Sequence, residues 1–259
     1  MHTEERNGLK LLRFDVFRDE PGLECAVSTR AGGSSAGGYA GLNLGSESGD
    51  SPENVERNLA LFCAALGAEP GRLARMRQRH TANVAVVRAG GAPAENTDAL
   101  VTGEPGVPLL AVSADCALTV FYDRVHRAAA VAHSGWRGAL LDVYGAVLDV
   151  MRLNFGTEPG DVSAGVSPMI SAANYPVRED FLKVLKSFYP AGADRPFLML
   201  KEGRHFFSLR ELLRQRLESL GVGRYESMHL CTYSEKELFY SWRRDGEGTG
   251  RFGLLAMLK

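Results

Sequence analysis

Short apolar segments of strand character dominate this sequence and limit the folds that it can adopt. They outnumber the segments with helical periodicity about three to one, and they do not alternate regularly with them. A regular alternation of strand and helix would indicate a Rossmann fold or an eight-unit barrel. The irregular order instead predicts a single α/β (α+β) domain, with a mixed β-sheet sandwich as its core and helices packed on the outside.

The individual elements follow from the hydrophobic period and from the residues that begin and end helices. Strands are expected at 11–17, 23–29, 84–88, 98–102, 108–114, 117–122, 127–133, 161–166, 196–201, 226–231, 238–242 and 251–258. Helices are expected at 52–66, 137–153, 178–188 and 209–219. The first helix has Ser51 and Pro52 at its start and Gly67 after its end, which are favoured residues at those positions.

Composition and charge indicate an ordinary globular protein. No linker, charge block or repeat divides the 259 residues, so one domain over 1–259 is expected. A net charge of -1 gives no electrostatic footprint for nucleic acid or an anionic membrane. The N-terminal region lacks the apolar run of a signal peptide, and the four cysteines form no Cys-x-x-Cys pair. These features predict a cytoplasmic protein without a disulfide framework.

Three residues are the best candidates for chemistry: His80, Cys116 and His133. Each lies where a predicted strand meets a turn, a place where side chains commonly emerge into a cleft. Two imidazoles and one thiolate can hold a zinc ion and leave a fourth position open. The same residues taken singly also fit structural roles, and their wide spacing along the chain does not show that they meet. The pattern alone leaves both interpretations open.

A series of short motifs, in a fixed order, resembles the laccase-domain family of purine nucleoside phosphorylases, which is also described as a family of multicopper polyphenol oxidases. The motifs lie at residues 28–34, 42–45, 78–80, 98–102, 114–116, 133–138, 231–233, 239–245 and 249–251. The resemblance runs from about residue 23 to 255. The ordered set is far more specific than any one motif.

The resemblance implies an activity, a cofactor and a set of site residues. It implies phosphorolysis of adenosine, inosine, guanosine and methylthioadenosine, deamination of adenosine, and a zinc site of His80, Cys116 and His133. The catalytic residues are then expected to be Asp115, Cys116 and Arg30. The expected substrate-binding residues are Arg30, Asn43, Gln78, Trp136, Arg137 and Tyr175.

Arg30 is expected, from the resemblance, to contact phosphate or substrate together with Gly32 and Gly33. An arginine fork and the backbone donors of a glycine-rich loop suit an oxyanion beside the ribose C1. A flexible surface loop would have the same composition. The segment contains neither a Gly-x-Gly-x-x-Gly nor a Walker-type motif, which argues against dinucleotide and ordinary nucleoside-triphosphate binding.

Asp115 is the candidate proton carrier for deamination. Zinc deaminases use a Glu in a His-x-Glu motif, and no such Glu follows His80 or His133. A rival role for Asp115 is to orient a metal-ligating histidine through its second ring nitrogen. Trp136 and Tyr175 could stack on a purine. At Pro176 the chain departs from the Tyr-Glu-Val of the family, and the proline removes a backbone donor and fixes a dihedral angle beside the expected substrate wall.

Other functions compete with the zinc phosphorylase. A two-His, one-Cys set can hold copper, as in a polyphenol oxidase, but six histidines without a His-x-His pair argue against a multicopper enzyme. Alternatively, Cys116 and His133 could be the nucleophile and base of a hydrolase or transferase that edits cell-wall precursors, which leaves His80 without a role. A non-enzymatic binding module is the simplest alternative. Partners are expected to be small molecules, and the protein a monomer or small homo-oligomer.

Overall fold

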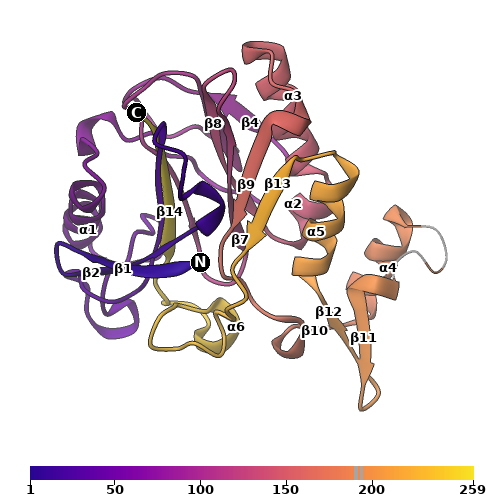
Figure 1. Ribbon diagram of the computed structural model, residues 1–259. Helices are drawn as coiled ribbons and strands as arrows, with labels where there is room; N and C mark the ends of the chain where they lie inside the picture. The colour runs from indigo at the N-terminus through magenta and orange to yellow at the C-terminus, as the bar shows by residue number, and fades with distance from the viewer. Residues whose placement is uncertain (190–191, 193–194) are drawn as a thin grey trace.

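Two large β-sheets lie face to face, and helices cover their outer faces (Figure 1). The computed structural model describes residues 1–189, 192 and 195–259. This arrangement confirms the predicted mixed sheet sandwich with helices on the outside. It has four layers: helix α1 (Pro52–Ala65), a five-stranded sheet, a six-stranded sheet, and a group of helices that includes α3 (Val143–Phe155) and α5 (Leu209–Ser219).

The five-stranded sheet is antiparallel throughout. Its strands lie in the order β1 (His2–Arg6), β2 (Leu9–Arg13), β3 (Leu23–Ser28), β14 (Phe252–Leu258) and β6 (Leu109–Ser113). Helix α1 (Pro52–Ala65) packs Leu59 and Phe62 against Leu11 and Leu255 on its outer face. The Ser51 hydroxyl accepts a hydrogen bond from the Asn54 N–H and caps this helix, as the sequence predicts.

The six-stranded sheet is mixed. Its order is β13 (Arg224–Ser227), β9 (Val162–Val166), β7 (Ala117–Asp123), β8 (Ala128–Ser134), β5 (Ala99–Thr102) and β4 (Val84–Val86). Only the two outermost pairs, β13 with β9 and β4 with β5, are parallel. The residues of β5, β7, β8 and β9 are all buried, because both faces of the sheet are covered.

Alternation along the strands builds two separate cores on the six-stranded sheet. Leu100 and Val131 point into the sandwich, whereas Val101 and Ala130 face the helices. On that outer side lie α2 (Trp136–Leu140), α3 (Val143–Phe155) and α5 (Leu209–Ser219). A small third sheet of β10 (Pro176–Val177), β12 (Arg204–Phe207) and β11 (Leu198–Lys201) lies with α4 (Glu179–Phe188) at one end of the molecule (Figure 1).

The predicted strand at 238–242 is wrong. Phe239 and Tyr240 are fully buried, but neither belongs to a strand: turns at 236–238 precede them, and the four-residue helix α6 (Trp242–Asp245) begins at the end of the segment. The apolar run therefore reflects burial without strand pairing. Two other predicted strands end four residues early: 11–17 stops at Arg13, before a 3-10 turn at Asp15–Phe17, and 226–231 stops at Ser227, the end of β13.

The predicted helix at 137–153 is two helices. Asp142 lies between them with a φ of 65°, a left-handed conformation that ends α2. Its carboxylate accepts a hydrogen bond from the Gly145 N–H and begins α3. The same carboxylate forms an ion pair with Arg216 of α5, which fixes the break against a neighbouring helix. The other predicted helices are confirmed to within about two residues at each end.

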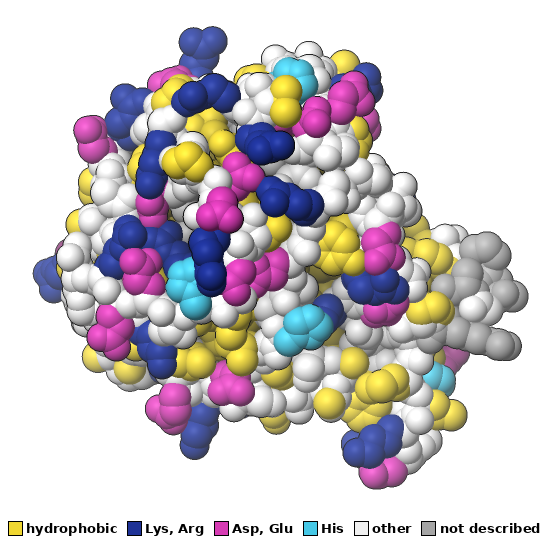
Figure 2. All heavy atoms as spheres, in the orientation of Figure 1, with side chains coloured by type: hydrophobic (Ala, Val, Ile, Leu, Met, Phe, Trp, Pro, Cys, Tyr) yellow, Lys and Arg dark blue, Asp and Glu magenta, His cyan; other side chains and the backbone are white. Residues whose placement is uncertain are grey.

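The surface is of mixed charge on the face shown in Figure 2. Lys and Arg side chains are interspersed there with Asp and Glu, and no area of a single sign dominates. Among the described residues, no helix combines the length and the apolar character that crossing a membrane would need.

Candidate metal centre and substrate cavity

The structure brings His80, Cys116 and His133 together at one end of the six-stranded sheet. Cys116 directly precedes β7, and His133 lies near the end of the neighbouring strand β8, so strand pairing places them side by side. His80 comes from the loop before β4 and adopts a φ of 60°. One donor atom from each residue lies within 4.8 Å of the other two.

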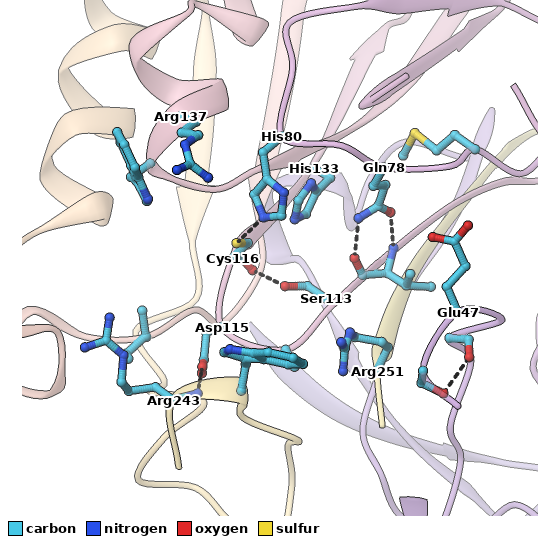
Figure 3. Close-up of a pocket in the computed structure, with 18 of the residues that line it drawn as sticks. Glu47, Gln78, His80, Ser113, Asp115, Cys116, His133, Arg137, Arg243 and Arg251 are labelled. Atoms are coloured by element: carbon cyan, nitrogen blue, oxygen red, sulfur yellow. Dashed lines mark hydrogen bonds between the residues drawn. The ribbon is translucent and has the colours of Figure 1, made fainter. Parts of the chain in front are cut away.

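The three side chains fit the size of a metal site. The distance from His80 Nε2 to Cys116 Sγ is 3.8 Å. Tetrahedral zinc with ordinary bond lengths separates a nitrogen and a sulfur ligand by about 3.6 Å. The imidazole rings of His80 and His133 lie edge to face with centroids 4.9 Å apart, so each ring can direct a nitrogen at the space between them (Figure 3). The donor set therefore suits a borderline-soft ion such as zinc.

Asp98 orients both histidines, and the sequence interpretation missed it. This buried carboxylate accepts a hydrogen bond from His133 Nδ1 at 2.9 Å, which leaves Nε2 free as a ligand. It also accepts from the backbone N–H groups of Arg79, His80 and Thr81 and from the Thr81 hydroxyl. Asp98 therefore fixes one ring directly and the turn that carries the other. The orienting role considered for Asp115 belongs to Asp98.

The electrostatics of the cluster favour a thiolate. Burial by itself would raise the pKa of the Cys116 thiol, but the neighbouring His133 and His80 imidazoles outweigh it and lower that pKa to about 6. Burial likewise opposes charge on His133, yet Cys116 and Asp98 raise its pKa to about 9. A thiolate is the form of cysteine that binds metal.

Gly135 allows the three ligands to approach one another. A Cβ atom at this position would lie 2.8 Å from Cys116 Sγ and 2.8 Å from His80 Cδ2. Contacts this short are not tolerated without movement of the ligands. The glycine of the His133–Gly138 segment is thus required by the space beside the cluster, not by an unusual backbone angle.

The cluster lies in the wall of a cavity of about 420 Å³. This volume is within the range of small-molecule sites. The lining comes from segments far apart in the sequence: the loop at 45–48, the region of His80, the ends of β6 and β8, helix α2, and α6 (Figure 3). Polar side chains on it include Glu47, Gln78, Asp115, Arg137, Arg243 and Arg251.

Each of the three cavity arginines lies over an aromatic ring. Arg137 is 4.7 Å from the centroid of Trp136, Arg243 is 5.0 Å from that of Tyr175, and Arg251 is 5.4 Å from that of Trp242. In the part of the chain that the structure describes, none of the three forms an ion pair with a carboxylate within 4.0 Å. Their positive charges are therefore available to an anionic ligand.

Asp115 lies in the cavity wall beside Cys116. Its two carboxylate oxygens accept hydrogen bonds from the Thr232 hydroxyl and from the Arg243 N–H, each at 2.7 Å. The contact with Arg243 joins the turn that carries Cys116 to α6 (Figure 3). The residue has a φ of 104°, an unusual backbone angle for a non-glycine residue, which marks this turn as one held by its surroundings.

The other predicted substrate-binding residues divide into two groups. Gln78, Trp136, Arg137 and Tyr175 line the cavity. The Gln78 amide exchanges two hydrogen bonds with the backbone of Val112, so it also ties the His80 loop to β6. Arg30 and Asn43 are not among the lining residues.

Arg30 and Asn43 hold loops behind the cavity. The Arg30 guanidinium donates to the Ala40 and Lys236 carbonyls and lies over the Tyr240 ring. Asn43 is fully buried, and its Oδ1 accepts from the Arg251 N–H at 2.8 Å. It thereby positions an arginine that does line the cavity. Arg243, Arg251 and Trp242 were missed as individual site residues, although the motifs at 239–245 and 249–251 include them.

Fold and cavity together define a class of protein: a four-layer α/β sandwich with a two-His, one-Cys cluster that could hold a metal ion, in a cavity lined by arginines. Solved structures share this fold. Bacillus licheniformis protein YfiH superposes with a TM-score of 0.89 at 28% identity and covers 99% of both chains. YlmD from Geobacillus stearothermophilus superposes with a TM-score of 0.90 at 26% identity, and the match covers 99% of this chain and 98% of the YlmD chain.

Sequence comparison identifies the family. The model of the multi-copper polyphenol oxidoreductase laccase family matches residues 24–259. The purine nucleoside phosphorylase of Deinococcus radiodurans is 39% identical, over 94% of this chain and 91% of its own. Purine nucleoside phosphorylase YfiH of Escherichia coli is 32% identical, over 89% of this chain and 91% of the relative. The chain belongs to the multi-copper polyphenol oxidoreductase laccase family, which confirms the resemblance drawn from the motifs.

Proposed function

We propose that this protein is a zinc-dependent purine nucleoside phosphorylase that also deaminates adenosine. The observation that carries the proposal is the combination, in one cavity, of a two-His, one-Cys cluster and three arginines that form no ion pair with a carboxylate of the described residues. The names of the relatives from Deinococcus radiodurans and Escherichia coli support the same activity. The proposed substrates are adenosine, inosine, guanosine and methylthioadenosine, each with phosphate.

His80, Cys116 and His133 are the proposed zinc ligands. In the described ranges, one group of three metal-binding side chains is found, which supports a single ion and argues against a multicopper centre. When bound, zinc supplies a Lewis acid at the cavity wall. Asp98 holds His133 in the tautomer that presents Nε2 to the ion.

Arg137, Arg243 and Arg251 are the proposed phosphate-binding residues, in place of Arg30. Phosphorolysis requires an oxyanion to be held beside the ribose C1 while the bond from that carbon to the purine nitrogen breaks. Guanidinium groups offer paired donors that match phosphate oxygens. The aromatic rings beneath them limit their movement and so prepare the site for the anion.

Asp115 is the proposed proton carrier in deamination. It lies in the cavity wall, next to Cys116 in sequence, and both of its oxygens are already oriented by Thr232 and Arg243. A proton carrier must be held within reach of the group that it serves. If an Asp115→Asn variant that keeps its zinc deaminates adenosine at the wild-type rate, this role is excluded.

A Cys116 nucleophile is the second candidate. The lowered pKa of its thiol and the 3.8 Å distance to His80 Nε2 favour an activated cysteine in the absence of metal. Such an enzyme would be a hydrolase or transferase, with cell-wall precursors among its substrates. It would be inhibited by zinc, whereas the proposed phosphorylase would require it. A copper-dependent polyphenol oxidase would instead require oxygen.

One experiment separates these functions. Zinc-loaded protein is incubated anaerobically with inosine, with and without phosphate, and hypoxanthine release is followed. Release that depends on phosphate and zinc is expected. The Arg243→Ala substitution should raise the KM for phosphate at least ~10-fold. The control substitution Arg88→Ala removes an exposed arginine that does not line the cavity, and it should leave this KM unchanged. Turnover that needs oxygen or copper, or none with phosphate, would refute the proposal.

The remaining parts of the proposal concern location and partners. All four cysteines are free thiols in the structure, which supports a cytoplasmic location. The proposed ligands are small molecules, with no nucleic-acid or membrane partner, and the proposed state is a monomer or small homo-oligomer.

A further inference from the structure

Trp242 differs from the other two aromatic residues that line the cavity. Trp136 packs edge-on against Phe181 with centroids 5.1 Å apart, and Tyr175 packs edge-on against Phe207 at 5.7 Å. These contacts tie both rings into the core beside the six-stranded sheet. Trp242 has no aromatic neighbour of this kind among the described residues, and it is 47% exposed. An exposed indole on a cavity wall is apolar surface available to a ligand.

One side of the Trp242 ring is already occupied. The Arg251 guanidinium lies 5.4 Å from the ring centroid. It is held there by hydrogen bonds to the carbonyls of Thr249 and Gly250, at 2.7 and 2.9 Å. The indole therefore rests on a fixed cation. What it still offers to the cavity is flat aromatic surface, which favours a flat ligand.

The backbone of Trp242 is fixed relative to the metal cluster. It is the first residue of α6, which the Ser241 hydroxyl caps by accepting from the Arg244 N–H. The next residue, Arg243, donates its backbone N–H to Asp115, and Asp115 immediately precedes Cys116. The backbone next to Trp242 is thus anchored, through the Arg243–Asp115 hydrogen bond drawn in Figure 3, to the turn that carries a proposed metal ligand.

We propose that Trp242 is the stacking platform for the purine ring of the substrate. This inference rests on the proposed function, because it requires a purine ligand. Stacking on an aromatic side chain is tolerant of ring substituents, since every purine has a similar π-face. The platform therefore accepts each purine of the proposed substrates without distinguishing their ring substituents. It also transfers the stacking role considered for Trp136 and Tyr175 to a residue with a free surface.

The first test uses fluorescence, because the chain has two tryptophans. A Trp136→Phe variant leaves Trp242 as the reporter, and the matched Trp242→Phe variant leaves Trp136. Zinc-loaded protein is titrated with hypoxanthine in the absence of phosphate, with excitation at the red edge of tryptophan absorption. Saturable quenching is expected in Trp136→Phe. Quenching confined to Trp242→Phe, or absent from both while wild-type protein cleaves inosine, would overturn the inference and leave the proposed function standing.

The second test is kinetic. Loss of stacking in Trp242→Ala should raise the KM for inosine about 5- to 150-fold and change kcat much less, because the contact forms on binding. Trp242→Phe should restore most of the affinity, since it keeps an aromatic ring. An unchanged KM in Trp242→Ala would overturn the inference. Saturable quenching of Trp242 in a protein that shows no phosphorolysis would support the platform and refute the proposed reaction.

Discussion

Replacing Asp98 with Asn should weaken zinc binding through a change of histidine tautomer. Oδ1 of Asp98 accepts from His80 N–H and His133 Nδ1, whereas Oδ2 accepts from two backbone N–H groups and the Thr81 hydroxyl. An asparagine amide will place its single oxygen where three donors meet, and so its NH₂ group will face the two histidine contacts. His133 can then pair with that group only by accepting through Nδ1, which puts its proton on Nε2.

The size of the effect follows from these contacts. Loss of the partner that orients a metal-ligating histidine lowers metal affinity about 10- to 100-fold, or about 1.4–2.7 kcal/mol, and the unfavourable tautomer places this variant near the upper end. The His80 N–H also loses its acceptor, which should destabilise the apo fold by about 1–3 kcal/mol. Burial works against the Asp98 charge, but its hydrogen bonds hold its pKa well below the usual range. Asp98 is therefore fully ionised at pH 7, and comparing the zinc affinities of Asp98→Asn and the wild type at that pH measures the full contribution of the carboxylate.

Asp123→Asn is the matched control. Asp123 is also fully buried and accepts from a histidine, His126 Nδ1 at 2.8 Å, and from the backbone N–H groups of Val125 and His126, but it lies outside the cavity lining. Both variants should lose thermal stability in circular dichroism. In zinc competition against a chromophoric chelator, only Asp98→Asn should bind more weakly. Equal zinc affinities in Asp98→Asn and the wild type would refute the tautomer argument.

Three further outcomes are expected. Gly135→Ala should lower zinc affinity at least ~10-fold by crowding the ligands, whereas Gly71→Ala, which meets no atom within 4 Å, should leave chelator competition unchanged. Cys231 should be alkylated by iodoacetamide in folded protein at a rate that rises through pH 7, because burial opposes its thiolate but hydrogen bonds outweigh burial and lower its pKa to about 7. Burial raises the pKa of the Cys25 thiol to about 12, so mass spectrometry should find Cys25 unmodified. Equal labelling of both would contradict this. Ser51→Ala removes the α1 cap and should lower the free energy of unfolding, measured in urea, by about 1 kcal/mol. An unchanged free energy would mean that the cap does not stabilise the fold.

The sequence predicted most strands because their burial pattern is local. Residues such as Val131 and Leu254 lie in short apolar runs, bounded by polar or turn residues, whose length indicates strands whatever their partners. The polar strand β1 (His2–Arg6) was missed for the same reason, since an exposed edge strand carries no apolar pattern. Asp142 was missed as a helix break because its left-handed conformation is held by Gly145 and by Arg216, a residue far away in the chain.

The sequence by itself determined the sandwich class, the three candidate ligands and, through its ordered motifs, the family. It could not show that His80, Cys116 and His133 meet, because 36 and 17 positions separate them along the chain and only strand pairing removes that separation. Nor could it show that Asp98 orients His133, since 35 positions separate the two residues and they meet only where β5 lies against β8. The exposed surface of Trp242 was likewise decided by tertiary structure. Whether a side chain packs into a core or faces a cavity depends on contacts between distant segments, and these are fixed only when the sheets have assembled.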